Sequence, residues 1–257
     1  MEPGRFNTDT VALKQRMQAH DKYGSNDLNV WIMEHLQLEP GLSVLDAGCG
    51  TGKQTLPIAQ VVGESGHVLA VDLAREALDA LSQSSKELGL EKRIGLLRLD
   101  LDDLGEHLQE EGFDRVLSSY ALYYTRHVQT LFGVLHRSLK PGGTLFFCGP
   151  SRANNCELKE FHYGLRGEKQ PPESGGAVFM EDTGPRLAHR YFARVEASTF
   201  QNTLRFNSAD ALYRYWSSYN LYDEQLDTGF RAAATRHFET RAVFETVKRV
   251  IGIRAVK

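Results

Sequence analysis

The stretch VLDAGCGTGKQ, residues 44–54, decides the fold expected for this 257-residue chain. An apolar run ends in Asp46, and glycines then occupy every second position, at Gly48, Gly50 and Gly52. Glycine allows a sharp turn and lets a ligand approach the backbone where a Cβ would obstruct it. The pattern predicts a buried strand, a glycine loop and a helix, over residues 42–48, 48–52 and 53–62.

Strands and helices alternate around this loop as far as residue 150. Further apolar strands are expected over residues 67–73, 93–101, 113–122 and 144–150. Helices are expected over residues 9–20, 26–36, 74–90 and 127–140, the last one stopped by Pro-Gly-Gly at 141–143. Apolar strands joined by helical crossovers imply an α/β fold, with a parallel sheet covered on both faces.

The alternation breaks after residue 150. Residues 166–176, RGEKQPPESGG, predict a loop, and residues 190–206 predict a strand. Two helices, over 208–226 and 230–244, precede a last alternating stretch at 246–256. The sequence therefore predicts two closing strands with a helical insertion between them.

Composition narrows the class of protein. The formal net charge of −3 argues against a nucleic-acid or acidic-membrane partner, since both favour a basic surface. The three cysteines have no paired spacing, which is typical of a reducing compartment, and no metal-ligand spacing is present. No apolar run approaches the ~20 residues that span a bilayer, and the first ten residues lack a signal-peptide core. We expect a cytoplasmic protein without a metal.

The spacing of the glycines separates two kinds of ligand. A dinucleotide site needs G-x-G-x-x-G, but here Lys53 occupies the position of the third glycine, and a G-K-[ST] phosphate loop is also absent. Asp46 would place a negative charge close to a pyrophosphate. The loop therefore fits a ligand that carries a positive charge and no phosphate.

The run LDAGCGTG resembles motif I of the class I S-adenosylmethionine (SAM)-dependent methyltransferases. The resemblance extends over about residues 40–150. Asp72 and Asp100 end the second and third strands, FDRVLSSYAL resembles the fourth strand of the family, and LKPGGTLFF resembles the entry to the fifth. It implies a doubly wound, seven-stranded sheet in the order 3-2-1-4-5-7-6, with strand 7 antiparallel. It also implies SAM as cofactor and S-adenosylhomocysteine as product.

The resemblance implies cofactor contacts at the carboxyl ends of these strands. Asp72 would accept both ribose hydroxyls, and Asp100, in competition with Asp102 and Asp103, would contact the adenine. Cys49 fits a small filler better than a nucleophile. Ser118 either lies beside the methionine end of the cofactor through its backbone or is simply a strand-end residue. The expected cofactor-binding residues are Tyr23, Asp46, Gly48, Cys49, Gly50, Asp72, Leu73, Asp100, Leu101 and Ser118.

Aromatic residues suggest where an acceptor would bind. Residues 161–222 contain 12 of the 25 aromatic residues of the chain. Tyr215, Trp216 and Tyr219 share one helical face, which either packs the insertion onto the sheet or lines a substrate pocket. Tyr120, Tyr123 and Tyr124 follow the fourth strand, nearer to the expected methyl group, and at least one of them should face the substrate.

Methyl transfer from a sulfonium is an in-line displacement at carbon, in which alignment is the main contribution of the enzyme. An oxygen nucleophile also needs a general base, and Tyr124 and His162 are the catalytic candidates. No NPPY or DPPY motif follows the fourth strand, where the sequence reads SSYALYY. This absence disfavours the amino-group methyltransferases of DNA and of protein glutamine.

We therefore expect a methyltransferase that acts on an O, N or C atom of a small biosynthetic acceptor, as a monomer or homodimer. The alternatives are a nucleic-acid or protein methyltransferase and a non-catalytic SAM-binding protein. The expected organisation is an N-terminal helical lid segment, a SAM-binding core, a helical lid insertion and a closing strand, over residues 1–40, 41–206, 207–245 and 246–257.

Overall fold

The structure is a computed structural model that describes residues 15, 18–20, 22–168 and 173–257. The predicted helix over residues 9–20 lies mostly outside the described residues. The chain divides into two compact units. The sheet unit comprises Asn29–Ser151, Gly175–Thr199 and Ile251–Lys257, and the helical unit comprises the described residues up to Leu28, with Arg152–Ser174 and Phe200–Val250.

The seven strands form one sheet in the predicted order, β3-β2-β1-β4-β5-β7-β6. The strands are β1 (Ser43–Ala47), β2 (His67–Asp72), β3 (Ile94–Arg98), β4 (Phe113–Ser119), β5 (Leu139–Pro150), β6 (Arg194–Phe206) and β7 (Phe244–Val256). Strands β1 to β5 pair in parallel. The amide of Lys257, just after β7, bonds the carbonyl of Gly143, near the start of β5, at 3.0 Å, so β7 runs antiparallel to β5. The predicted fold class is confirmed.

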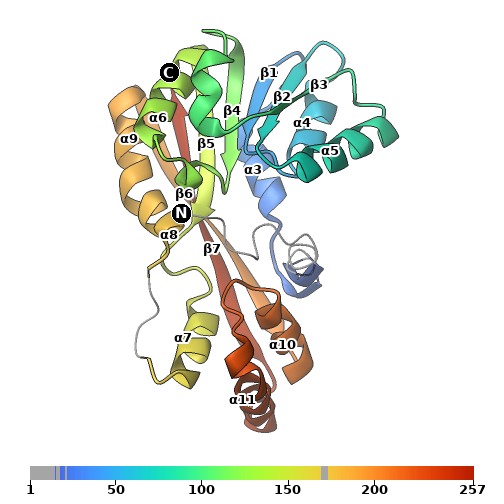
Figure 1. The fold of residues 1–257 in the computed structure, drawn as a ribbon, viewed down its shortest axis with the longest axis vertical. Coiled ribbons are helices and arrows are strands. Elements are labelled where there is room, and N and C mark those ends of the chain that lie inside the picture. Colours follow the sequence, from blue (N-terminus) through green and yellow to red (C-terminus); the bar gives the residue numbers. More distant parts are fainter. Residues whose placement is uncertain (1–14, 16–17, 21, 169–172) are drawn as a thin grey trace. The chain divides into compact units, whose positions relative to one another are not determined.

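Helices cover both faces of the sheet unit (Figure 1). On one side lie α3 (Leu28–Leu36), α4 (Thr55–Val62) and α5 (Arg75–Glu87). On the other lie α6 (Val128–Ser138), α8 (Gly175–Val178), the π-helical turn η3 (Phe179–Thr183) and α9 (Gly184–Tyr191). The short helices η1 (Leu101–Glu106) and η2 (Leu122–Tyr124) follow β3 and β4.

Apolar spacing explains why these helices form and pack. In α6, Leu131, Phe132 and Leu135 recur three to four residues apart and are buried in one cluster against the sheet residues Val116 and Phe147. In α5, Leu78 and Leu81 face inward in the same way. The sheet is therefore buried on both faces, as the continuous apolar strands predicted.

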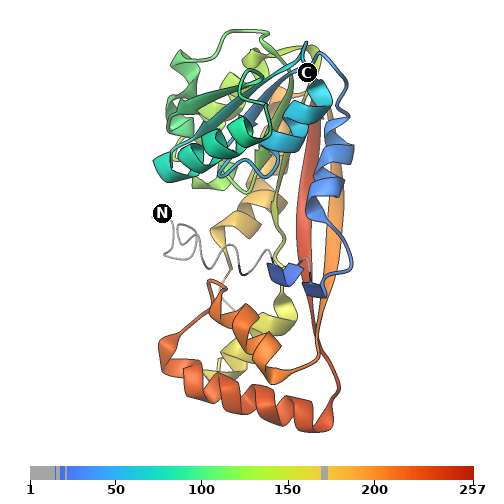
Figure 2. The same cartoon turned by 90° about the vertical axis from the view of Figure 1, so that its right-hand side faces the viewer.

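The helical unit gathers α7 (Cys156–Leu165), α10 (Ala209–Ser217), η4 (Glu224–Leu226) and α11 (Asp227–Thr240), with the parts of β6 and β7 that belong to it (Figure 2). The predicted helix over 208–226 is interrupted after Ser217. The side chain of Asp223 caps η4 and starts a separate turn there. The helical insertion between the two closing strands is present as predicted, but residues 152–174 group with it rather than with the sheet.

Three local expectations need correction. Helices α7, α8 and α9 were not predicted, because short helices with few apolar residues give a weak periodic signal. The strand expected from residue 190 begins at Arg194, since α9 continues to Tyr191. Pro141-Gly142-Gly143 lies inside β5, where the pairing with β4 has an irregularity between Phe113 and Arg115.

Within the described residues, no helix has both the length and the apolar character needed to cross a membrane.

Candidate functional site

The glycine loop joins the carboxyl end of β1 to α4. All three of its glycines have positive φ, +83° at Gly48, +54° at Gly50 and +83° at Gly52, which side-chain-bearing residues rarely adopt. A Cβ at Gly48 would lie 2.2 Å from the Cβ of Ala121, and one at Gly52 would lie 2.2 Å from Leu81 Cδ1. At Gly50 a Cβ would meet nothing within 4 Å. Two glycines therefore serve close packing, and the third borders open space.

The backbone N–H groups of the loop are used within the protein. Those of Gly48 and Cys49 donate to the carbonyl of Val71 at 2.8 and 3.0 Å. That of Gly50 donates to Asp72 Oδ2 at 2.7 Å, and that of Gly52 to the carbonyl of Cys49 at 3.0 Å. A phosphate-binding loop offers such groups to its ligand. These four donors are already occupied, which disfavours a dinucleotide at this loop.

A buried carboxyl group lies directly behind the loop. Asp46 is 1% exposed and accepts a hydrogen bond from Thr55 Oγ1 at 2.6 Å. Burial raises the pKa of Asp46 from 3.8 to about 7, opposed by the Thr55 hydroxyl and reinforced by the charge of Asp72. Burial likewise raises the pKa of the Cys49 thiol, so Cys49 is a neutral packing residue and not a nucleophile.

Asp72 stands at the edge of the loop, at the carboxyl end of β2. Its Oδ2 accepts from Gly50 and its Oδ1 from the N–H of Ala74 at 2.9 Å. Each carboxylate oxygen has two lone pairs, so both oxygens keep capacity for a further donor such as a ribose hydroxyl. Leu73, the next residue, exposes 60% of its surface, which leaves an apolar side chain available beside the carboxylate.

Two of the three aspartates after β3, Asp102 and Asp100, differ in their hydrogen-bond partners. Asp102 accepts the N–H groups of Arg126 and His127 at 3.0 and 2.9 Å, and its side chain is only 4% exposed. Desolvation opposes ionisation there, yet these hydrogen bonds lower the pKa of Asp102 below its usual value. Asp102 therefore fixes the entry to α6.

The side chain of Asp100 is 35% exposed and so is more accessible than that of Asp102. It caps η1 through the N–H of Asp102 at 3.0 Å, and its other oxygen lies 3.9 Å from the guanidinium of exposed Arg126. Leu101 packs its side chain against the main core of the sheet unit.

The end of β4 and the residues that follow it lie against the glycine loop. Ser118 is buried, and its hydroxyl donates to the carbonyl of Ala47 at 2.7 Å, so its side chain ties β4 to β1 and is not available to a ligand. Tyr120 has a φ of +60°, an unfavourable conformation for a tyrosine. Ala121 follows and packs against Gly48. The strained turn at Tyr120 thus places this segment against the glycine loop.

Tyr123 and Tyr124 differ in exposure. Tyr123 packs into the core against Phe179, and burial, with the neighbouring Tyr124 charge, raises the pKa of Tyr123 well above its usual value. Tyr124 exposes 44% of its surface, with its ring 4.7 Å from that of Tyr123. Of the tyrosines predicted to face the substrate, Tyr124 is the most accessible and Tyr123 supports it.

His162 lies in α7 of the helical unit, away in sequence from the loop. It is 2% exposed, and the indole N–H of Trp216 donates to its Nδ1 at 3.2 Å. Burial, with the charge of Arg166, lowers the pKa of His162 and favours the neutral ring. Because an indole N–H is only a donor, the proton of the neutral ring resides on Nε2. This tautomer has no free lone pair, so the arrangement disfavours the predicted role of His162 as a general base.

The aromatic residues predicted to line the acceptor pocket are mainly core residues of the helical unit. Trp216 is fully buried and stacks on Phe230 with the ring centroids 4.0 Å apart. Tyr215 is also buried and accepts a hydrogen bond from Asn155 Nδ2 at 3.1 Å. Tyr219 is partly buried, with Asn154 Nδ2 3.2 Å from its hydroxyl. For these residues the packing interpretation is the one that their environment supports.

Tyr23, predicted to contact the cofactor, also belongs to the helical unit. Its ring packs against Phe206 at 5.1 Å between centroids, in the cluster that contains Tyr215 and Trp216. Its predicted contact with SAM stays a prediction.

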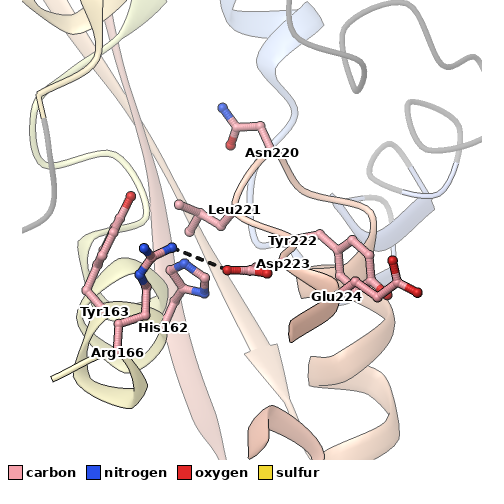
Figure 3. A pocket seen from close by; sticks show the side chains of 8 residues that line it. All are labelled: His162, Tyr163, Arg166, Asn220, Leu221, Tyr222, Asp223 and Glu224. Atoms are coloured by element: carbon pink, nitrogen blue, oxygen red, sulfur yellow. Dashed lines mark hydrogen bonds and ion pairs between the residues drawn. The ribbon is translucent and has the colours of Figure 1, made fainter. Parts of the chain in front are cut away.

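Sequence reasoning missed a cavity in the helical unit. It has a volume of about 390 Å³ and is shown in Figure 3. Its lining residues come from α7 and from the segment between α10 and η4: His162, Tyr163, Arg166, Asn220, Leu221, Tyr222, Asp223 and Glu224. The cluster of tyrosines around residue 219 was the only signal, and it did not identify the charged residues. Within the described ranges, no group of three or more His, Cys, Asp or Glu side chains is arranged to hold a metal ion.

Residues 38–188 match the methyltransferase domain family. This match covers more than half of the chain, which therefore belongs to that family. The sheet order and the position of the glycine loop agree with this assignment.

Known relatives are similar over part of their length. The chain is 30% identical over 90 residues to a probable cobalt-precorrin-6B C(15)-methyltransferase of Thermoplasma acidophilum, which covers 35% of the chain and 43% of that protein. It is 29% identical over 183 residues to a ubiquinone/menaquinone biosynthesis C-methyltransferase of Vibrio vulnificus, covering 71% and 68%. Matches to two further curated relatives span 18% and 54% of their lengths.

A solved structure with a similar fold is a SAM-dependent methyltransferase from Aquifex aeolicus. It aligns with a TM-score of 0.54 and 17% sequence identity, over 72% of the chain and 89% of that protein. At this identity the likeness concerns the fold.

Proposed function

We propose that the protein is a SAM-dependent methyltransferase that transfers a methyl group to an O, N or C atom of a small-molecule acceptor. The observation that carries this proposal is the internal use of the loop N–H groups beside the open space at Gly50. Four N–H groups of the loop are already used within the protein, and the loop leaves room for a ligand against bare backbone. Two carboxyl groups, Asp46 and Asp72, adjoin it. A phosphate-free sulfonium nucleoside suits this environment.

Different residues around the loop would bind different parts of the cofactor. Asp72 would hold the ribose hydroxyls, Leu73 would cover an apolar face of the nucleoside, and Asp100 and Leu101 would contact the adenine. Asp46 acts through the loop, because its carboxyl group is buried behind the glycines and bonded to Thr55. SAM, when bound, supplies a methyl group on a good leaving group. Orientation of the acceptor is then the main task of the protein.

Tyr124 is the proposed residue for contact with the acceptor. It is the exposed phenol of the segment that packs against the glycine loop. Ser118 and Tyr123 are committed to the core and support its position. The small-molecule class is further supported by the quinone and precorrin methyltransferases among the relatives.

Calorimetric titration with SAM, S-adenosylhomocysteine and NAD tests the binding step. We expect the two SAM-type ligands to bind and NAD not to bind, and tighter binding of NAD would overturn the assignment. Asp72→Ala should weaken SAM binding by about 1.5–3 kcal/mol through the loss of charge-assisted hydrogen bonds. Asp79→Ala is the matched control, since Asp79 is an exposed carboxylate of α5 paired only with Arg75 at 3.8 Å.

Incubation with methyl-labelled SAM and an extract of the source cells tests the transfer step. Label in a small molecule supports the proposal, whereas label only in RNA, DNA or protein supports the corresponding macromolecular alternative. SAM binding without any labelled product would indicate a non-catalytic SAM-binding protein.

A further inference from the structure

His162 lines the cavity of the helical unit with a ring N–H group. The Nδ1 of His162 accepts from Trp216, which leaves the proton on Nε2. Among the described residues, none accepts a hydrogen bond from this Nε2, although the side chain is 2% exposed and lines the cavity. A ligand in the cavity could therefore supply an acceptor for the Nε2–H group of His162.

The charges at the cavity are unbalanced. Arg166 is the cation of the lining, and it is paired with Asp223 at 3.3 Å (Figure 3). It also pairs with Glu168, outside the lining, at 2.7 Å. Glu224 adds a further exposed carboxylate to the lining. The charged residues of the lining, Arg166, Asp223 and Glu224, carry a net charge of −1 when all three are ionised, from two carboxylates and one guanidinium. This surplus favours a ligand with a positive charge.

Aromatic rings complete the lining. Tyr163 meets the His162 ring edge-on, with 4.8 Å between centroids, and Tyr222 lies edge-on to Trp216 at 5.0 Å. Such rings bind apolar parts of a ligand and attract organic cations through their faces. The volume of about 390 Å³ falls within the range of about 300–1,000 Å³ typical of small-molecule sites.

We propose that this cavity is a binding site for a small organic amine that also carries a hydrogen-bond-accepting oxygen. The oxygen accepts from His162 Nε2, and the ammonium group lies toward Glu224 and Asp223. Leu221 and the rings of Tyr163 and Tyr222 enclose the carbon skeleton. The site is independent of the glycine loop, so it stands whether or not the SAM assignment is correct.

Three probes of similar shape test this proposal on the whole chain: tyramine, neutral 4-hydroxyphenethyl alcohol and anionic 4-hydroxyphenylacetate. We expect affinity to fall in that order, and tyramine to shift the Nε2 resonance of His162 in ¹⁵N NMR spectra. Glu224→Gln should weaken the binding of tyramine by roughly 1.5- to 5-fold, which is the effect of one exposed charge, and should leave the binding of the alcohol unchanged. Glu76→Gln, on exposed α5, is the matched control.

Leu221→Trp is the second test, because it fills the cavity without removing any polar group. It should abolish binding of all three probes while leaving SAM binding unchanged. Equal affinity for the three probes, preference for the anion, no binding of tyramine, or binding without a response of His162 would each overturn the proposal.

Discussion

Replacement of Asp46 by asparagine should change how the stability of the protein depends on pH. Burial raises the pKa of this carboxyl group from 3.8 to about 7. Between these values Asp46 is protonated in the native state and ionised in the unfolded chain, so the native state binds more protons. The free energy of unfolding then falls as the pH rises through this window.

The magnitude follows from the size of the shift. At about 1.4 kcal/mol per pKa unit, the rise from 3.8 to about 7 corresponds to about 4 kcal/mol of unfolding free energy lost between pH 4 and pH 8. Asp46→Asn removes the titrating group, so the variant does not lose this free energy of unfolding as the pH rises. Near pH 4 the variant should be equal to or less stable than the wild type, because the amide N–H₂ group brings two donors to a buried site where the protonated carboxyl group has one. Above pH 7 it should be the more stable protein.

Urea unfolding of both proteins at intervals from pH 4 to pH 8, without SAM, measures the difference. The difference between their unfolding free energies should change by about 4 kcal/mol and level off near pH 8. Thr55→Val removes the hydrogen bond that lowers the pKa of Asp46, so it should move the transition to higher pH. A difference that stays constant across this range would show that burial does not penalise the Asp46 carboxylate.

Further substitutions test three other features of the structure. Gly48→Ala should destabilise the fold, because the added Cβ would lie 2.2 Å from Ala121. Gly50→Ala should cost only about 1–2 kcal/mol of backbone strain but should greatly weaken SAM binding. Thermal melts measure the effect on stability, and titrations with SAM measure the effect on binding. Glu157→Gln should lower stability at pH 7 by about 1–3 kcal/mol, because Arg249 loses its ionised partner at 2.8 Å. Since the pKa of Glu157 is depressed from 4.5 to about 2, chiefly by Arg249 against desolvation, this difference should shrink as the pH falls between those values in urea unfolding. Asp102→Ala should cost about 1–3 kcal/mol in the same assay and leave SAM affinity nearly unchanged, in contrast to Asp100→Ala.

The outcome for individual residues shows how far sequence reasoning reached. The positions at the strand ends were predictable, because a parallel strand that ends in an aspartate places it at the ligand-binding edge of the sheet. Their roles were not. Asp102 proved to be a cap for the α6 entry, and the Ser118 hydroxyl proved to be a tie between strands. Hydrogen-bond partners decided these roles, and such partners are distant in the sequence.

The aromatic residues of the helical unit show the same limit. Helical spacing correctly placed Tyr215, Trp216 and Tyr219 in one cluster, but a shared face does not say what covers it. The structure covers it with Phe206, Phe230 and His162, from three other elements. The cavity beside them is lined by α7, a helix that the sequence did not reveal.

The resemblance to the class I methyltransferases implied the order of the strands, and the sequence by itself determined the class of fold and the place of the glycine loop. These depend on short-range patterns: apolar runs, their alternation with helices, and glycines where the backbone must turn with positive φ. Only the tertiary structure decided which glycine faces open space, which loop N–H groups are already used, and which histidine nitrogen carries the proton. Those properties arise where Ala121, Leu81, Asp72 and Trp216 meet the residues in question, and contacts between distant segments exist only once the chain has folded.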